Sequence, residues 1–237
     1  MKLYPAIDLL NKRCVRLYKG LYDNVTDYGD PVEMAAKWKA MGATFLHLVD
    51  LDGAKEGRSV NLDVVKDLIL KVGINVELGG GLRTLEKIDE VLSIGVSRVI
   101  LGSAALKNPS LVVEAIKKHG AEKVVVGVDT KEFKVSINGW IEKSDVDALD
   151  FAKTLEKSGV KYIIFTDISK DGTLSGINVE QTKTLVDNTN INIIASGGVK
   201  TIEDLRAANK IGCEGIIIGK ALYEGTIDLK KALEEFK

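Results

Sequence analysis

The chain has few residues of the kinds that bind metal ions or form disulfides. Its 237 residues include only two cysteines and two histidines. Cys14 and Cys213 lie far apart and lack the spacing of a metal site or redox pair, so we expect independent thiols in a reducing compartment. With so few His and Cys ligands, no zinc site or other metal site is predicted.

The chain also lacks a strong net charge and a long hydrophobic segment. Its 33 basic and 34 acidic residues leave a formal net charge of -1, which gives no overall field to attract nucleic acid or an acidic membrane. Any anion site must therefore be local. No apolar run approaches membrane-spanning length, and the start at Met1 has no signal-peptide segment. We expect a cytoplasmic protein that binds neither nucleic acid nor membrane.

What the chain does have is a regular alternation of strand and helix signals. The expected strands are nearly continuous apolar runs, a pattern typical of parallel strands covered on both sides. They are Leu3–Ile7, Thr44–Val49, Ile74–Leu78, Arg98–Leu101, Lys123–Val128, Lys161–Phe165, Ile191–Ala195 and Gly215–Ile218. The expected helices are amphipathic segments with proline, threonine or aspartate near the start. They are Pro31–Met41, Leu62–Val72, Thr84–Ile94, Pro109–His119, Asp147–Ser158, Val179–Asn188, Thr201–Ile211 and Asp228–Phe236.

Eight such pairs predict an α/β protein with one domain over residues 1–237, a (β/α)8 TIM barrel. A doubly wound open sheet is the competing arrangement, but it needs no eightfold count and predicts no half-chain repeat. The chain does repeat, since residues 74–106 set against 191–223 give 11 identities in 33 positions at an offset of 117. The alternative is that any two βα units look alike, but such chance similarity would not keep the same offset of 117 along the chain. We expect duplicated half-barrels of about residues 1–120 and 121–237.

The repeat contains glycine turns suited to phosphate. Gly79–Thr84 and its copy Ser196–Thr201 each join a strand to a helix, where free backbone N–H groups and the helix dipole favour an anion. The turns at Gly102-Ser103 and Gly219-Lys220 are also 117 residues apart, and barrels often bind phosphate after strands 7 and 8, beside a short extra helix that Ala221 could begin. Tight turns without a ligand are the alternative. Two sites suggest a ligand with two phosphates.

Carboxylates end strands at equivalent places in the two halves. Asp8 and Asp129 form one pair and are candidates for general acid–base work, although helix capping or a loop salt bridge is the commoner role of such residues. Asp50 and Asp167 form a second pair. A catalytic role and a structural role, in which each carboxylate binds backbone N–H groups of a loop, are equally favoured for them. Thr166 could bind substrate or position a carboxylate.

Other side chains give weaker signals. His47 lies within an apolar strand, which favours a hydrogen-bonded core residue over a ligand, and His119 ends a helix and is expected at the surface. Three long connections are candidate lids, because active sites of barrels lie at the carboxyl ends of the strands. They are Leu9–Asp30, which carries Arg13, Arg16, Lys19 and Gly20, Thr130–Val146, which carries Trp140, and Ile168–Ile177, which contains Asp171-Gly172 and Gly176.

Several motifs, spread over the full length of the chain, resemble those of one known family. They are Pro5-Ala6-Ile7-Asp8-Leu9, His47-Leu48-Val49-Asp50-Leu51-Asp52-Gly53-Ala54, Gly79-Gly80-Gly81-Leu82-Arg83, Asn138-Gly139-Trp140, Thr166 to Thr173 and Ser196-Gly197-Gly198. The chain closely resembles the phosphoribosylformimino-aminoimidazole carboxamide ribotide isomerases of histidine biosynthesis. The resemblance implies an Amadori rearrangement of an aminoaldose to an aminoketose, on a small-molecule substrate with a phosphate at each end. It implies no metal, no redox cofactor and no obligatory protein partner.

The resemblance also implies residue roles. Asp8 looks like the general base at C2 of the opened ribose, Asp129 like the general acid that opens the ring, and Thr166 like a supporting hydrogen-bond partner. Trp140 looks like a stacking surface for the imidazole carboxamide, with packing under its own loop as the alternative. The predicted substrate- and phosphate-binding residues are Arg16, Gly80, Gly81, Arg83, Gly102, Ser103, Trp140, Gly172, Gly176, Gly197, Gly198, Gly219 and Lys220.

Three alternative functions stay open. The cyclase subunit of imidazole glycerol phosphate synthase shares the barrel and both aspartates, but Cys is expected there in place of Ile7, Asn-Gly-Trp is not expected in the fifth loop, and ammonia from a partner is needed. A bifunctional isomerase would also act on phosphoribosyl anthranilate. A non-catalytic phosphosugar-binding barrel is opposed by intact Asp8 and Asp129.

Overall fold

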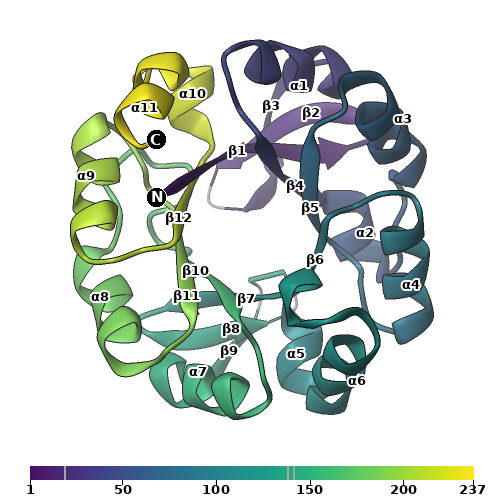
Figure 1. Cartoon of the computed structure of the whole chain (residues 1–237), viewed down its shortest axis with the longest axis vertical. Helices are drawn as coiled ribbons and strands as arrows, with labels where there is room; N and C mark the ends of the chain where they lie inside the picture. The colour runs from purple at the N-terminus through teal and green to yellow at the C-terminus, as the bar shows by residue number, and fades with distance from the viewer. Residues whose placement is uncertain (19, 138, 141) are drawn as a thin grey trace.

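The strands form a closed parallel barrel. The computed structural model describes residues 1–18, 20–137, 139–140 and 142–237, and within these residues eight parallel strands follow the order β10-β11-β12-β1-β4-β5-β6-β7, with β7 pairing back to β10 (Figure 1). They are β1 (Lys2–Leu10), β4 (Phe45–Asp50), β5 (Asn75–Gly79), β6 (Arg98–Leu101), β7 (Val124–Lys131), β10 (Tyr162–Asp167), β11 (Asn192–Ser196) and β12 (Gly215–Ile218). Each overlaps a predicted strand, so the TIM barrel is confirmed. The duplication of its halves stays a prediction.

Helices surround the barrel, as Figure 1 shows. Those that return the chain from one barrel strand to the next are α1 (Pro31–Ala40), α3 (Leu62–Val72), α4 (Leu85–Ser93), α6 (Pro109–His119), α7 (Ala148–Lys157), α8 (Val179–Asn188) and α9 (Ile202–Lys210), and α11 (Leu229–Glu235) follows the last strand. Their ends follow local capping chemistry. Asp30 accepts hydrogen bonds from the backbone N–H groups of Val32 and Glu33 at the start of α1, and Thr201 and Asp204 form a capping box on α9.

The first and fifth connections differ from expectation, because each folds as an antiparallel extension of its barrel strand. β2 (Arg13–Tyr18) pairs with β1 and with β3 (Leu21–Gly29), and β8 (Lys134–Ile137) pairs with β7 and with β9 (Glu142–Asp147). Strands 1 and 5 of the barrel thus each carry a two-stranded arm. Lys19, in the first connection, and Asn138, in the Asn-Gly-Trp motif, lie outside the described residues.

Short helices decorate the carboxyl ends of the strands. They are α2 (Leu51–Glu56), α5 (Ser103–Lys107) and α10 (Lys220–Tyr223), and a 3-10 turn η1 (Ala121–Lys123) precedes β7. The extra helix expected near Ala221 is therefore present as α10. Its counterpart after the fourth strand, α5, begins at the matching glycine turn.

The hydrophobic core has two layers separated by the barrel wall. Between the strands and the helices, outward side chains such as Leu46 and Leu78 are fully buried. Inside the barrel, Ala6, Ile100, Val125, Ile164, Ile194 and Ile217 form a second cluster above Tyr4. Along the same inward rows toward the carboxyl ends, β5 and β7 carry Gly79 and Gly127. Because glycine has no side chain, these positions leave unfilled space inside the barrel near the carboxyl ends of the strands.

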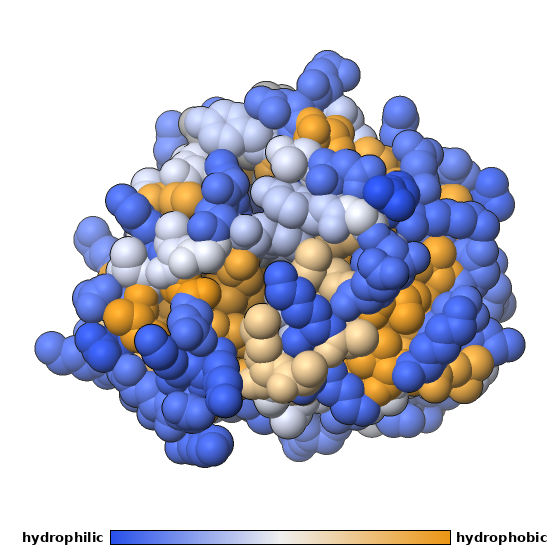
Figure 2. All heavy atoms as spheres, turned by 90° about the horizontal axis from the view of Figure 1, so that it is seen from above, coloured by the Kyte–Doolittle hydropathy of each residue, from blue (hydrophilic) through white to orange (hydrophobic). Residues whose placement is uncertain are grey.

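Seen from the side of the barrel, hydrophilic side chains project over most of the surface and hydrophobic residues show between them (Figure 2). None of the helices in the described part of the chain has both the length and the apolar character needed to cross a bilayer.

Candidate active site

A cavity of about 790 Å³ occupies the carboxyl ends of the barrel strands. Interior residues of the barrel, among them Ala6, Ile100 and Ile217, form its floor, and the connections after the strands form its walls. This is the end at which barrel enzymes carry their active sites, because loops from several strands converge there.

The structure brings nearly all of the predicted site residues to this cavity. The catalytic candidates Asp8, Asp129 and Thr166 line it. The predicted binding residues that also line it are Arg16, Gly80, Gly81, Arg83, Gly102, Ser103, Trp140, Gly172, Gly197, Gly198, Gly219 and Lys220. Gly176 is the exception. Its backbone N–H donates to the carbonyl of Gly198 at 2.8 Å, so it supports a glycine turn from behind.

The two glycine turns have a steric reason to be glycine. Gly81 and Gly198 adopt φ of 74° and 85°, in the left-handed region that side chains disfavour. A Cβ atom at either position would collide with a backbone carbonyl, that of Gly53 or that of Gly176. The chain can therefore pass closely under the cavity and expose its backbone to a ligand. The helices that follow begin at Leu85 and Ile202, directly after threonine caps.

Asp8 is paired with a cation from the neighbouring arm. The Arg16 Nη1 atom lies 2.9 Å from Asp8 Oδ2, and both side chains are almost buried. Burial lowers the pKa of Arg16, but Asp8 and Asp171 raise it further, so the net shift is upward. The Arg16 guanidinium also lies against the backbone at Gly219, where a Cβ atom would collide with it. Arg16 thus links Asp8 to the glycine turn at Gly219-Lys220, which follows the last barrel strand.

Asp129, at the equivalent place on β7, has different neighbours. Burial raises its pKa, and hydrogen bonds from Trp140 and Thr166 offset part of that shift. A carboxyl group with a raised pKa retains its proton to higher pH, which suits a general acid. The two symmetric aspartates therefore differ in their surroundings, since one is held by a guanidinium and the other by neutral donors.

Asp171 is a third carboxyl group in the cavity, which the sequence did not identify as a site residue. Burial raises its pKa to about 6, Arg16 opposes that shift, and Asp8 and Asp129 add to it. Its position in the turn before Gly172 was the available signal. The sequence could not show that the turn folds inward over the cavity.

The arms from the first and fifth strands meet over the cavity. Trp140 has φ of 73°, in the left-handed region, and its ring packs on Gly20, where a Cβ atom would collide with it. Trp140 also lines the cavity. The ring therefore touches the opposite arm and the cavity at the same time, rather than packing only under its own loop.

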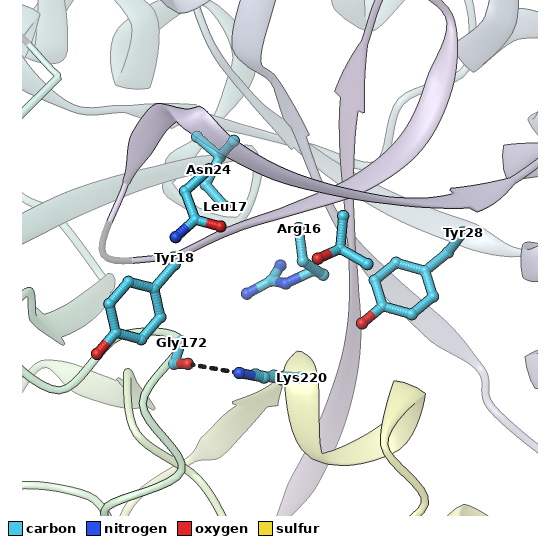
Figure 3. A pocket seen from close by; sticks show the side chains of 8 residues that line it. Arg16, Leu17, Tyr18, Asn24, Tyr28, Gly172 and Lys220 are labelled. Carbon is cyan, nitrogen blue, oxygen red and sulfur yellow. Dashed lines mark hydrogen bonds between the residues drawn. The ribbon is translucent and has the colours of Figure 1, made fainter.

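A smaller pocket of about 290 Å³ adjoins the cavity on the side of the first arm. Figure 3 shows the guanidinium of Arg16 between Tyr18 and Tyr28, with Lys220 below it. Lys220 Nζ donates to the carbonyl of Gly172 at 3.2 Å. Two cations, Arg16 and Lys220, thus lie at the glycine turn that begins with Gly219, where a phosphate site is predicted. On the other side of the cavity, Arg83 Nη2 donates to the carbonyl of Ala54 at 3.3 Å.

Asp50 and Asp167, the second symmetric pair, hold loops in place. Asp50 is fully buried and accepts hydrogen bonds from the backbone N–H groups of Gly53 and Val60 and from the amide of Asn61, the last at 2.7 Å. Asp167 likewise accepts from the amide of Asn178 at 2.7 Å. Neither carboxylate lines the cavity. The structure thus favours the structural interpretation of this pair.

His47 is hydrogen-bonded within the barrel, as expected of a core residue. Its Nδ1 atom lies 2.9 Å from Glu77 Oε1, yet the ring also lines the cavity. The position of His47 on an inward row could be read from strand alternation, but its height at the cavity floor could not. His119 pairs with Asp89 at 2.6 Å, away from the cavity.

No metal-binding cluster of three or more His, Cys, Asp or Glu side chains occurs among the described residues. Cys14 and Cys213 are both buried and free. Burial raises the pKa of Cys14 to about 11 and that of Cys213 to about 12, so both thiols stay protonated at neutral pH.

The closed barrel, and the cavity at the carboxyl ends of its strands with Asp8 and Asp129 in its lining, define a (β/α)8-barrel enzyme. The chain belongs to the histidine biosynthesis protein family, whose model matches residues 2–228. It is 49% identical over 238 residues to an Acetivibrio thermocellus enzyme and to a Thermoanaerobacter pseudethanolicus enzyme, with all of this chain and all of each relative covered. A Clostridium botulinum relative is also 49% identical, over 99% of this chain and 97% of its own length. All three are named 1-(5-phosphoribosyl)-5-((5-phosphoribosylamino)methylideneamino)imidazole-4-carboxamide isomerase.

Proposed function

We propose that this protein isomerises the same phosphoribosyl compound as these relatives, with Asp8 and Asp129 as its acid–base pair. Identity of 49% over the full length of both chains makes it an isomerase of histidine biosynthesis. The observation that supports the residue roles is the placement of Asp8 and Asp129 at the ends of β1 and β7, around one cavity and in unlike surroundings.

The reaction begins with opening of the sugar ring. Asp129 donates a proton to the ring oxygen as the bond from that oxygen to C1 breaks, and the nitrogen lone pair forms the C1=N bond of a Schiff base. The raised pKa of Asp129 suits this step, because the proton must still be present at neutral pH.

Asp8 then removes the proton from C2 of the opened sugar. The C2–H electrons form a C1=C2 bond, and the C1=N electrons return to nitrogen, which gives an enolamine. Loss of the enol proton and protonation at C1 complete the aminoketose, so the reaction needs no oxidant or reductant. Arg16, 2.9 Å from Asp8, holds this carboxylate in the cavity.

The glycine turns hold the ends of the substrate in this proposal. One phosphate lies at Gly80 and Gly81 and the other at Gly197 and Gly198, with the turns that begin α5 and α10 beside them. Trp140 stacks on the imidazole carboxamide between them. Two anchored phosphates place the reacting sugar over the aspartates, which lowers the entropic part of the barrier.

Asp171 is a second candidate for the acid. Its pKa of about 6 lies nearer to neutral pH than the usual value of an aspartate, and it lies near Asp8 and Asp129. Asp129→Asn and Asp171→Asn distinguish the two candidates. The variant that lacks the true acid should no longer open the sugar ring, whereas the other variant should still open it.

The test is to incubate the purified protein with the phosphoribosyl compound alone and to follow its isomerisation. We expect turnover without ammonia or a partner protein, and a requirement for added ammonia would instead indicate the cyclase reaction. Phosphoribosyl anthranilate in a parallel assay shows whether the enzyme is bifunctional. The reaction is proposed to occur in the cytoplasm, where buried free thiols such as Cys14 persist.

A further inference from the structure

A row of charged and polar side chains runs through the barrel beneath the cavity. His47 on β4, Glu77 on β5 and Arg98 on β6 occupy paired positions across three neighbouring strands. Glu77 has no exposed surface and does not line the cavity, whereas His47 does. Glu77 therefore cannot reach a substrate except through the histidine.

Glu77 makes one hydrogen bond and one longer ion-pair contact. Glu77 Oε1 lies 2.9 Å from His47 Nδ1, and Glu77 Oε2 lies 3.8 Å from Arg98 Nη1. Arg98 is held in turn, because its guanidinium stacks 4.1 Å from the ring centroid of Tyr162 and donates to the Tyr4 hydroxyl at 3.2 Å. A buried carboxylate with a guanidinium on one side and an imidazole on the other cannot rotate freely.

This arrangement determines which nitrogen of His47 carries the proton. An ionised carboxylate only accepts hydrogen bonds, so His47 Nδ1 must donate to Glu77. In the neutral form of the ring, the lone pair is then on Nε2, on the edge away from Glu77. Asp129 and Asp171 lie within electrostatic reach of this ring in the cavity.

We propose that Glu77 is a positioning residue, which makes His47 Nε2 a hydrogen-bond acceptor for a hydroxyl group of the bound sugar. The proposal rests on the proposed function, since the sugar is the substrate's reacting end. A sugar hydroxyl can donate a hydrogen bond, and a ring nitrogen with a lone pair can accept it. A neutral acceptor orients the sugar without adding a further negative charge beside Asp8 and Asp129.

Glu77→Gln is the informative variant, because it preserves size and removes the charge. Arg98 offers only donors, so the new amide oxygen faces Arg98 and the new NH2 group faces His47 Nδ1. The proton of the imidazole must then move to Nε2, which turns the acceptor in the cavity into a donor. Asp89→Asn is the matched control, since Asp89 is the carboxylate partner of the other histidine, His119.

The direct measurement is the imidazole ¹H–¹⁵N spectrum of the whole protein. With two histidines in the chain, His119→Gln assigns both sets of signals. We expect neutral His47 to carry its proton on Nδ1 in the wild-type protein, on Nε2 in Glu77→Gln, and on Nδ1 in Asp89→Asn. A wild-type ring protonated on Nε2 overturns the proposal even if Glu77→Gln does not fold.

Kinetics test whether the effect passes through His47. Loss of the hydrogen bond should lower kcat/KM about tenfold in Glu77→Gln and leave it unchanged in Asp89→Asn. In a His47→Ala background, Glu77→Gln should have no further effect on kcat/KM. Additive losses would overturn the positioning role. If the wild-type protein did not isomerise the phosphoribosyl compound but showed the expected tautomers, the proposed function would fail while the orientation of His47 by Glu77 stood.

Discussion

Arg16 Nη1 lies 2.9 Å from Asp8 Oδ2, and the two residues come from adjacent strands of one antiparallel pair. Asp8 pairs with Val15 in the ladder, so Arg16 follows directly after the residue opposite the catalytic candidate. The equivalent aspartate, Asp129, receives hydrogen bonds from Trp140 and Thr166 instead. The two aspartates thus have different hydrogen-bonding partners, a cation for Asp8 and neutral donors for Asp129. This difference supports the proposal that Asp8 is the base and Asp129 the acid.

Asp8→Asn should lower kcat by about 100-fold to 10,000-fold, because an amide cannot accept the C2 proton. Substrate affinity should change little, since the phosphate turns remain. Single-turnover kinetics and equilibrium binding measure the two quantities. Asp67→Asn, which removes an exposed carboxylate paired with Lys71, serves as the control. Retention of wild-type kcat in Asp8→Asn would rule out the assigned base.

Asp171→Asn should change how stability depends on pH. The folded-state pKa of about 6 is above the value of 3.8 for an ordinary aspartate, so the folded protein binds this proton more tightly than the unfolded chain does. The resulting stability is complete below pH 3.8 and is lost as the pH rises through about 6. Asparagine stays neutral throughout.

The free energy of unfolding of Asp171→Asn, relative to wild type, should therefore rise between pH 4 and pH 7, by up to about 3 kcal/mol. Urea unfolding at both pH values measures this difference. Asp145→Asn, at an exposed position, should show no such trend. A constant difference for Asp171→Asn would mean that its carboxyl group is not buried as described.

Gly81→Ala and Gly198→Ala should raise KM for the bisphosphate substrate at least tenfold. Each new Cβ atom would collide with a backbone carbonyl and displace the turn from the phosphate. Gly159→Ala is the control, since Gly159 has φ of 85° but no atom of the described residues lies within 4 Å of its Cβ position. It should cost about 1 kcal/mol of stability through backbone strain alone and leave KM unchanged. Equal KM changes at all three sites would argue against phosphate binding at the turns.

Gly20→Ala should separate the two arms over the cavity. Its Cβ atom would occupy the position of the Trp140 ring, and Trp140 would lose its hydrogen bond to Asp129. We expect a roughly tenfold fall in kcat/KM, in line with loss of one hydrogen bond. In a Trp38→Phe background Trp140 is the sole tryptophan, so the tryptophan emission should shift to longer wavelength. Gly120→Ala, at another positive φ with open space around it, should do neither.

The barrel itself could be predicted from the sequence because its strands are short apolar runs and its helices are amphipathic segments with recognisable caps. All eight predicted strands are present, and the helices match within a few residues. The arms could not be predicted. β3 (Leu21–Gly29) is largely exposed and polar, so neither hydrophobic periodicity nor burial marks it as a strand. Its pairing with β2 is set by contacts across the chain.

Site residues could be predicted where the backbone geometry requires a particular residue type. They were harder to predict where the direction of a side chain determines whether it reaches the cavity. The glycine turns and Asp8 could be located from spacing alone. Asp171, by contrast, enters the cavity only because its turn folds inward, and Glu77 matters only through its two neighbours in the sheet. Such three-dimensional coincidences leave no local pattern in a single sequence.

The antiparallel pairing of β1 with β2 makes the position of Arg16 depend on the number of residues in the turn between these strands. Leu10 pairs with Arg13 across a turn of two residues, Asn11 and Lys12, and the ladder then carries the chain back to Arg16. If the two-residue turn were kept, inserting or deleting one residue before Arg13 would shift the ladder by one position and change which residue of β2 lies beside Asp8. Asp8 would keep its place in the barrel but lose its counter-charge. The number of residues at a surface turn thus sets the ionic partner of a carboxylate inside the barrel, a constraint that no substitution scan of the cavity would reveal.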